Sequence, residues 1–275
     1  MKFSELKFGI TGHTGVLGRE FIKKNKNLNF IKFKGDITKK NDVKKWFQKN
    51  PIDIIVHLAA VVPTNIVKKK INYAKKVNYT GTKLLVDEAV KYKKIKWFFY
   101  SSTSHVYKYS KNKISENSTI KPISKYGLTK LKGEKYIQKK LNRKIPFCIG
   151  RIFSFTSVHQ KKPFVIPSIV DKAKLKKKLT LFNNTNHLRD FLCVGDVSEA
   201  IKILIDKKST GIYNIGSGNK TLISDIIKLI FSKYKKNYLI NNNSKQTCLV
   251  SNNSKIKKLN WKPTKNIKSI VMDLF

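Results

Sequence analysis

The chain has 275 residues, of which 40% are hydrophobic and 11% aromatic, and it carries a formal net charge of +43 at pH 7. This hydrophobic content excludes a disordered protein, and no apolar run approaches the ~20 residues of a membrane span. Three scattered cysteines (Cys148, Cys193 and Cys248) lack metal-ligand spacing, and their odd number argues against a disulfide framework. We therefore expect a cytoplasmic globular protein without a leader peptide, a membrane segment or a metal site.

Apolar strands and amphipathic helices alternate through the first 153 residues. The predicted strands lie at 7–11, 30–33, 52–60, 96–100 and 146–153, and the predicted helices at 16–26, 42–49, 73–91 and 125–140. This alternation predicts an α/β fold with a Rossmann-type, doubly wound parallel sheet. After residue 154 the alternation blurs, which predicts a small C-terminal substrate-binding lobe. We place the NAD(P)-binding domain at 1–153 with a returning segment at about 191–207, and the lobe at 154–190 and 208–275.

The +43 charge invites a nucleic-acid-binding interpretation, which the basic residues themselves oppose. Only four of the 59 basic residues are arginine, the side chain best shaped to contact phosphates and bases. The lysines are also spread along the whole chain and form no single block. We therefore interpret the charge as a solvated lysine surface and expect no nucleic-acid partner.

A glycine-rich loop joins the first strand to the first helix. Gly12, Gly15 and Gly18 are spaced three residues apart between the strand 7–11 and the helix 16–26. Glycines there permit a tight turn and the close approach of a pyrophosphate, which the helix N-terminus can bind. The loop therefore predicts a dinucleotide site. We assign to this site Gly12, Thr14, Gly15, Val16, Leu17 and Gly18.

Tyr126 and Lys130 are candidates for a catalytic pair in the predicted helix 125–140. Four residues are about one helical turn, so both side chains lie on one face. A lysine ammonium beside a phenol favours the phenolate, and a phenol of lowered pKa can act as an acid or base near neutrality. Six tyrosines in the chain have a lysine four residues later, so the spacing alone singles out none of them. Thr103 supports this pair, because it follows the predicted strand 96–100, at the edge where ligands bind open α/β sheets.

The glycine spacing and the Tyr-x-x-x-Lys pair resemble the extended short-chain dehydrogenase/reductase superfamily. The resemblance is strongest to its NAD-dependent epimerase/dehydratase family, which acts on nucleotide sugars. Segments that resemble this family follow in the expected order along nearly the whole chain. They are 35–38, 57–60, 77–82, 100–107, 122–134, 189–197, 211–218 and 259–263.

The resemblance implies roles for individual residues. Thr103, Tyr126 and Lys130 would transfer the proton while hydride passes between the sugar C4 and a nicotinamide. The residues implied to bind the substrate are Ser104, His105 and Arg189, with Arg189 at the diphosphate. The cofactor contacts implied outside the glycine loop are Asp36, Ile37, Leu58, Ala59, Ala60, Asn78, Tyr126 and Lys130.

Two departures from the family pattern narrow the expected reaction. Dehydratases of this family place a glutamate two residues after the threonine, often preceded by an aspartate, whereas this chain has Ser104 and His105. The GDP-fucose synthase type places a cysteine at position 105 and a histidine where this chain has Phe164. Loss of water and double epimerisation are therefore disfavoured. Epimerisation at C4 and reduction of a 4-keto sugar both stay open, with His105 either a second acid/base or a packing residue.

The cofactor, NAD or NADP, also stays open. An acid that usually ends the second strand binds the ribose 2′-hydroxyl. Here Asp36 is the nearby acid, and Lys32 and Lys34 would suit a 2′-phosphate instead.

Two further expectations concern partners. The resemblance implies a homodimer through the helices 73–91 and 125–140. The alternative to an enzyme is a catalytically reduced dinucleotide-binding regulator or RNA-binding relative, because the same fold serves many functions.

Overall fold

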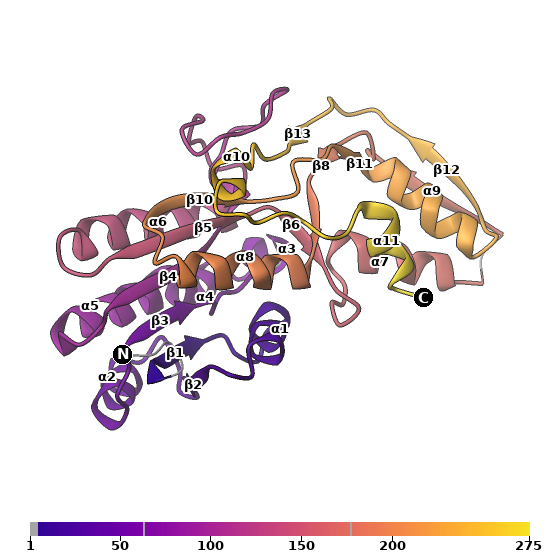
Figure 1. Ribbon diagram of the computed structural model, residues 1–275. Coiled ribbons are helices and arrows are strands. Elements are labelled where there is room, and N and C mark those ends of the chain that lie inside the picture. The colour runs from indigo at the N-terminus through magenta and orange to yellow at the C-terminus, as the bar shows by residue number, and fades with distance from the viewer. Residues whose placement is uncertain (1–4, 63, 177) are drawn as a thin grey trace.

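A parallel six-stranded sheet forms the centre of the computed structural model, which describes residues 5–62, 64–176 and 178–275 (Figure 1). The strands are β1 Lys7–Thr11, β2 Asn29–Lys32, β3 Ile54–His57, β4 Trp97–Thr103, β5 Phe147–Ile152 and β10 Gly211–Ile215. They lie in the order β10-β5-β4-β3-β1-β2, and each neighbouring pair is parallel. The order of the strands reverses beside β1, as in a doubly wound sheet. The predicted fold class is confirmed.

Helices cover both faces of the sheet because successive strand residues point to opposite sides. Ile54 and Val56 of β3 pack into one hydrophobic core, whereas Ile55 packs into the other. The first core is closed by α1 Val16–Lys24 and α8 Val194–Asp206. The second is closed by α2 Lys40–Lys49, α5 Thr82–Tyr92 and α6 Lys125–Leu141. Burial on both faces explains the continuous apolar runs Ile54–Val56 in β3 and Trp97–Tyr100 in β4.

The predicted helix 73–91 is part of a longer helical run with a change of pitch inside it. The run consists of α4 Ile71–Lys75, a π-helical turn Lys76–Gly81 and α5 Thr82–Tyr92. A short helix, α3 Thr64–Lys69, precedes it. Such π turns are often found at functional sites. In the described part of the chain, no helix has the length and apolar character needed to cross a membrane.

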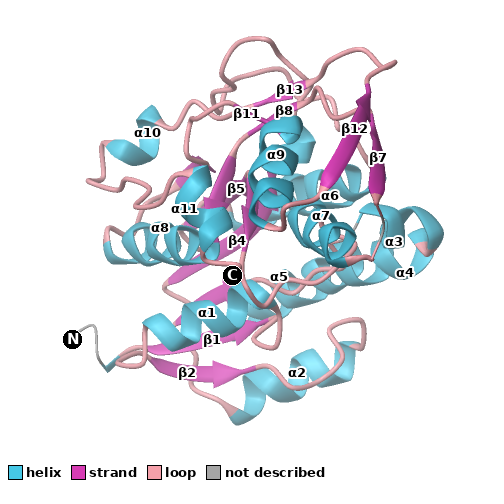
Figure 2. Cartoon of the chain, turned by 90° about the vertical axis from the view of Figure 1, so that its right-hand side faces the viewer, coloured by secondary structure: helices cyan, strands magenta, loops and turns pink. Residues whose placement is uncertain are grey.

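The small lobe lies to one side of the sheet in Figure 1. Its helices are α7 Val165–Lys174, α9 Ile223–Lys233 and α11 Ile267–Met272. Its strands are β7 Leu179–Asn183, β8 Leu188–Arg189, β11 Thr221–Leu222, β12 Asn237–Asn241 and β13 Cys248–Leu249. Figure 2, seen from the lobe side, shows α7 and α9 beside the parallel β7–β12 pair. Another parallel pair, β6 Ser154–Thr156 with β9 Phe191–Cys193, links the lobe to the sheet.

The predicted domain boundary needs one correction. All of 208–275 was expected in the lobe, but β10 is the edge strand of the main sheet, paired with β5. Ile256 of helix α10 Ser254–Lys257 and Trp261 also belong to the core closed by α1 and α8. The chain returns to the main sheet after α8. The local sequence of a short apolar segment does not indicate whether it packs against the sheet or the lobe.

Candidate active site

The glycine loop forms the floor of the site at the carboxyl end of β1. Gly12 has φ +74°, and a Cβ there would lie 2.5 Å from the backbone nitrogen of Ala59. A Cβ at Gly18 would collide with the carbonyl oxygen of Gly12. Gly15 is the N-cap of α1 and provides no side-chain cap, so the first amides of the helix face the loop. Glycine is therefore required here by positive φ and by close backbone approach.

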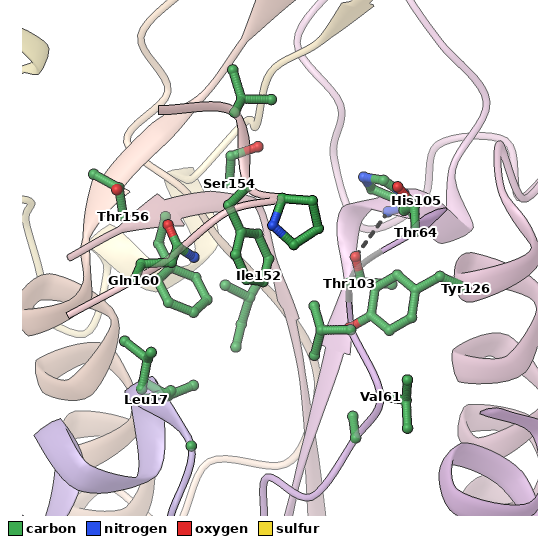
Figure 3. Close-up of a pocket in the computed structure, with 18 of the residues that line it drawn as sticks. Leu17, Val61, Thr64, Thr103, His105, Tyr126, Ile152, Ser154, Thr156 and Gln160 are labelled. Carbon is green, nitrogen blue, oxygen red and sulfur yellow. Dashed lines mark hydrogen bonds between the residues drawn. The ribbon is translucent and has the colours of Figure 1, made fainter. Parts of the chain in front are cut away.

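A cleft of about 1390 Å³ runs from this loop to the small lobe. The predicted residues that line it are Gly12, Thr14, Gly15, Val16, Leu17, Gly18, Asp36, Ile37, Leu58, Ala59, Ala60, Thr103, Ser104, His105, Tyr126 and Arg189. Figure 3 shows Thr103, His105 and Tyr126 on one wall, facing Thr156 and Gln160 across the cleft. Segments far apart in the sequence thus meet at one sheet edge, because the carboxyl ends of parallel strands share that edge.

Two predicted cofactor contacts, Asn78 and Lys130, do not line the cleft. The Asn78 amide accepts a hydrogen bond from the backbone nitrogen of Val61 (2.7 Å) and donates to the Val61 carbonyl (2.9 Å). It also donates to Thr129 Oγ1 at 3.1 Å. Asn78 therefore braces the loop after β3 against α6 from behind the cleft wall.

Lys130 is a buried ammonium side chain. It is 1% exposed, and its Nζ has no hydrogen-bond partner among the described residues. The Nζ lies over the ring of Tyr100, 4.0 Å from the centroid. Burial lowers the pKa of Lys130 to about 7, against the opposing charge of Glu134. The lysine is thus poised between its charged and neutral forms at neutral pH.

Thr103 and Tyr126 form the hydrogen-bonded pair at the cleft wall. Thr103 ends β4 and Tyr126 lies in the first turn of α6, which Ser124 caps by accepting from the Gly127 amide (3.0 Å). Burial raises the pKa of Tyr126 above its ordinary value, and the hydrogen bond with Thr103 opposes the shift. The expectation of a lowered Tyr126 pKa is wrong for this structure, because desolvation dominates. At neutral pH Tyr126 carries its proton.

His105 is a neutral group beside this pair. Burial, and then the charge of Arg189, lower the pKa of His105 to about 4. Its Nδ1 is 3.0 Å from Ser124 Oγ, and its ring packs edge-on against Tyr126 with centroids 5.9 Å apart. These contacts fit a packing and hydrogen-bonding histidine better than an imidazolium acid.

Arg189 reaches the cleft from β8 in a fixed orientation. Its Nη1 donates to the carbonyls of Leu188 (2.8 Å) and Thr247 (3.1 Å), and its Nη2 donates to Thr247 Oγ1 (2.9 Å). The guanidinium lies over the ring of Tyr109, 5.4 Å from the centroid. The guanidinium of Arg189 is therefore held in one orientation by hydrogen bonds to the lobe itself.

Several residues that line the cleft were not predicted from the sequence. From the small lobe these are Gln160, Lys172, Phe182, Thr185 and His187. Lys172 Nζ lies 4.6 Å from the centre of the Phe182 ring, which joins α7 to β7. The lobe contains many lysines, so no local pattern separates this one from those on the surface.

Carboxylates are scarce in the cleft. Among the described residues that line it, Asp36 is the only aspartate or glutamate. Asp36 lies next to the glycine-loop end, and its Oδ1 accepts from the nitrogen (2.9 Å) and Oγ1 (2.8 Å) of Thr38. The end where Thr103 and Tyr126 lie has hydroxyl and imidazole groups instead.

The residues present fit a dinucleotide. The glycine loop is a cradle that a single Cβ would fill, and it opens at the uncapped N-terminus of α1. The buried, unpartnered Lys130 Nζ, over the Tyr100 ring, is a donor in need of an acceptor. These are the features of a Rossmann-type site that binds a pyrophosphate and a ribose.

Residues 9–216 match the model of the NAD dependent epimerase/dehydratase family, so the chain belongs to that family. The dTDP-D-glucose 4,6-dehydratase of Dictyostelium discoideum is 30% identical over 222 residues, 75% of this chain and 51% of that protein. The same enzyme of Homo sapiens is 30% identical over 220 residues, 79% of this chain and 62% of that protein. The chain therefore spans less than two thirds of the length of these relatives.

Solved structures with the same fold include two dinucleotide complexes. RMD from Pseudomonas aeruginosa, complexed with NADPH, has a TM-score of 0.88 at 20% identity and covers 98% of each chain. UDP-glucose 4-epimerase from Thermus thermophilus, complexed with NAD, has a TM-score of 0.85 at 17% identity and covers 97% of this chain and 96% of its own. The predicted family is confirmed, and the description of that family names NAD as its cofactor.

Proposed function

We propose that the chain is an NAD(P)-dependent nucleotide-sugar epimerase or 4-keto-sugar reductase that works at the sugar C4. The observation that carries the proposal is the Thr103–Tyr126 pair in a cleft whose single described carboxylate is Asp36. Hydride transfer with one proton needs a single acid/base group, a role that a tyrosine hydroxyl can fill. Elimination of water, as in the dehydratases named above, needs a further acid/base group, for which a carboxylate is the usual choice.

Tyr126 is the proposed acid in the reducing direction. Its raised pKa keeps the phenol protonated, so it can donate to the oxygen that forms as a ketone becomes an alcohol. A bound nicotinamide supplies or accepts the hydride. Thr103 holds the phenol by a hydrogen bond. We assign to Lys130, one helical turn after Tyr126 on α6, the role of stabilising the phenolate when Lys130 is charged. In the oxidising direction the same phenolate accepts the hydroxyl proton.

Replacement of Tyr126 tests this mechanism directly. Tyr126→Phe removes the proton donor and is expected to lower turnover by about 10² to 10⁴ fold. Dinucleotide affinity, measured by calorimetry, should stay within about twofold, because the ring and its packing remain. Phe153→Tyr, a ring change at another cleft residue, is a control for perturbation of the cleft. Full activity of Tyr126→Phe would contradict the assignment.

Incubation with a panel of nucleotide sugars distinguishes the two reactions. An epimerase interconverts two sugars while the dinucleotide stays constant in amount. A reductase consumes one reduced dinucleotide for each sugar reduced. Formation of a dehydrated 4-keto-6-deoxy product from dTDP-D-glucose would contradict the carboxylate argument.

The +43 charge favours a second candidate, an RNA-binding relative that has lost turnover. Nonspecific lysine–phosphate attraction falls steeply with salt. RNA affinity that persists at about 0.2 M salt, together with no turnover on any sugar, would favour this candidate over the enzyme.

We also propose a homodimer in which α5 and α6 of two copies form a four-helix bundle. The two helices pack side by side, and Tyr136 of α6 donates a hydrogen bond to Asp87 of α5 (2.5 Å). Light scattering is expected to give about twice the 31.7 kDa chain mass, and a monomer at all concentrations would contradict it.

A further inference from the structure

A second, smaller cavity of about 450 Å³ adjoins the cleft at the glycine loop. Its lining residues are His13, Thr14, Arg19, Ile22, Lys23, Lys26 and Lys32. His13 and Thr14 also line the main cleft, so the two spaces meet at the loop. Each titratable side chain that the structure describes in this lining is basic.

The end of β2 places a lysine where a dinucleotide site commonly has an acid. In such sites an acidic residue about 20 positions after the glycine loop accepts the 2′-hydroxyl of the adenosine ribose. Here Lys32 is the last residue of β2 and the twentieth residue after Gly12. The next acids along the chain are used locally: Asp36 accepts from Thr38, and Asp42 Oδ2 accepts from the Asp36 amide (2.8 Å).

His13 adds a half-buried imidazole with one unpartnered nitrogen. Its Nδ1 is buried and makes no hydrogen bond to any described residue. Burial, and then the charges of Lys32 and Lys34, lower the His13 pKa, whereas a hydrogen bond to the Phe33 backbone raises it. His13, Lys32 and Lys34 thus converge beside the loop. An anion bound among them would hydrogen-bond to His13 Nδ1 and reduce the repulsion between the lysine charges.

We propose that this cavity binds the 2′-phosphate of NADP(H), so that the chain prefers NADP(H) to NAD(H). The inference rests on the dinucleotide site of the proposed function but not on the C4 reaction. A basic patch alone would mean little in a chain with 59 basic and 16 acidic residues. The location distinguishes this cavity. It adjoins the glycine loop and lies at the end of β2, where dinucleotide sites bind the adenosine ribose.

Calorimetric titration of the purified chain with NADPH and with NADH tests the preference without a sugar substrate. NADPH is expected to bind at least about tenfold more tightly at low salt, because the added phosphate gains charge-assisted hydrogen bonds. Adenosine 2′,5′-bisphosphate against 5′-AMP repeats the comparison with probes that differ only in the 2′-phosphate. Equal affinities within each pair would overturn the proposal and leave the proposed function standing. Absence of binding by every probe would overturn both.

A matched pair of variants separates the site from general charge. Lys32→Asp should remove the preference, with NADPH weakened about tenfold or more and NADH unchanged or tighter. Lys24→Asp makes the same charge change on α1 outside the cavity and should leave the NADPH-to-NADH ratio unchanged. Equal effects of the two variants on that ratio would show that the preference comes from the overall positive charge of the protein, and would overturn the proposal. Unfolding midpoints of both variants, measured alongside, identify any loss caused by misfolding.

Discussion

At the scale of single residues, burial of Lys130 lowers stability, whereas the proposed reaction uses its charge. The side chain is 1% exposed and without a hydrogen-bond partner among the described residues. Burying an ammonium without a partner destabilises a fold. In the proposed reaction Lys130, one helical turn after Tyr126 on α6, stabilises the phenolate by its charge. We therefore interpret Lys130 as a group that serves the proposed reaction at a cost in stability.

Lys130→Met is expected to stabilise the fold and to lower turnover. The folded pKa of about 7 lies below the ordinary value of 10.5, so the unfolded chain binds more protons between these pH values. Wild-type stability therefore rises with pH across this window, and the advantage of the variant shrinks. Urea unfolding should show a gain on the order of a few kcal/mol at pH 7 and a smaller gain at about pH 9.5. The exposed Lys139→Met on the same helix should show neither effect, and a gain independent of pH would contradict the argument.

At the scale of elements, a buried ion pair joins helix α6 to the sheet. Glu134 and Arg151 are 1% and 3% exposed, and Arg151 Nη2 lies 2.7 Å from Glu134 Oε2. Ser102 of β4 donates a short hydrogen bond to Glu134 Oε1, and Arg151 Nη1 donates to the Glu116 carbonyl (3.3 Å). This network fixes α6 against the ends of β4 and β5, where Thr103 and Tyr126 meet.

Glu134→Gln is expected to destabilise the protein by about 3–5 kcal/mol, because it leaves Arg151 charged and unpaired in the interior. The double variant Glu134→Gln with Arg151→Met should recover part of this loss, since it removes the stranded charge. Denaturant unfolding of both variants measures the difference. A loss below about 1 kcal/mol in the single variant would contradict a buried, coupled pair.

Local patterns predicted most elements of the Rossmann half, and their limits have physical causes. The helix 125–140 matches α6 within a residue, because an N-cap serine and a long run without proline mark it. The strand 96–100 was too short, since β4 continues to Thr103 through buried serines that an apolar pattern does not reveal. The π turn Lys76–Gly81 was not predicted, because it depends on how Asn78 meets Val61 and Thr129 across space.

At the scale of the whole molecule, the net charge of +43 is a source of self-repulsion. The structure offsets little of it, because most of the ion pairs described are exposed lysine–carboxylate contacts. Exposed pairs of this kind contribute little stability. The compact state therefore holds many like charges near one another, a condition that destabilises a fold at low ionic strength.

Stability is expected to rise with ionic strength. Screening shortens the range of repulsion from about 30 Å at 0.01 M salt to about 8 Å at 0.15 M. The thermal unfolding midpoint should therefore increase between these two conditions when measured by calorimetry in a non-coordinating buffer. Sodium chloride and potassium chloride should act alike if screening is the cause. An unchanged or lower midpoint would contradict a repulsion-limited fold.

The sequence by itself determined the alternating strands and helices, the glycine loop and the candidate residues Thr103 and Tyr126. The elements and the loop follow from local periodicity and from glycines at short spacing. The two candidate residues follow from their place after a predicted strand together with the family resemblance. Only the tertiary structure decided that β10 joins the sheet, that Lys130 and Asn78 lie behind the cleft, and that burial raises the Tyr126 pKa. It also showed that carboxylates are nearly absent from the described lining of the cleft and that basic groups converge beside the loop. Burial and neighbouring charge act through space, between segments that the sequence separates by many residues.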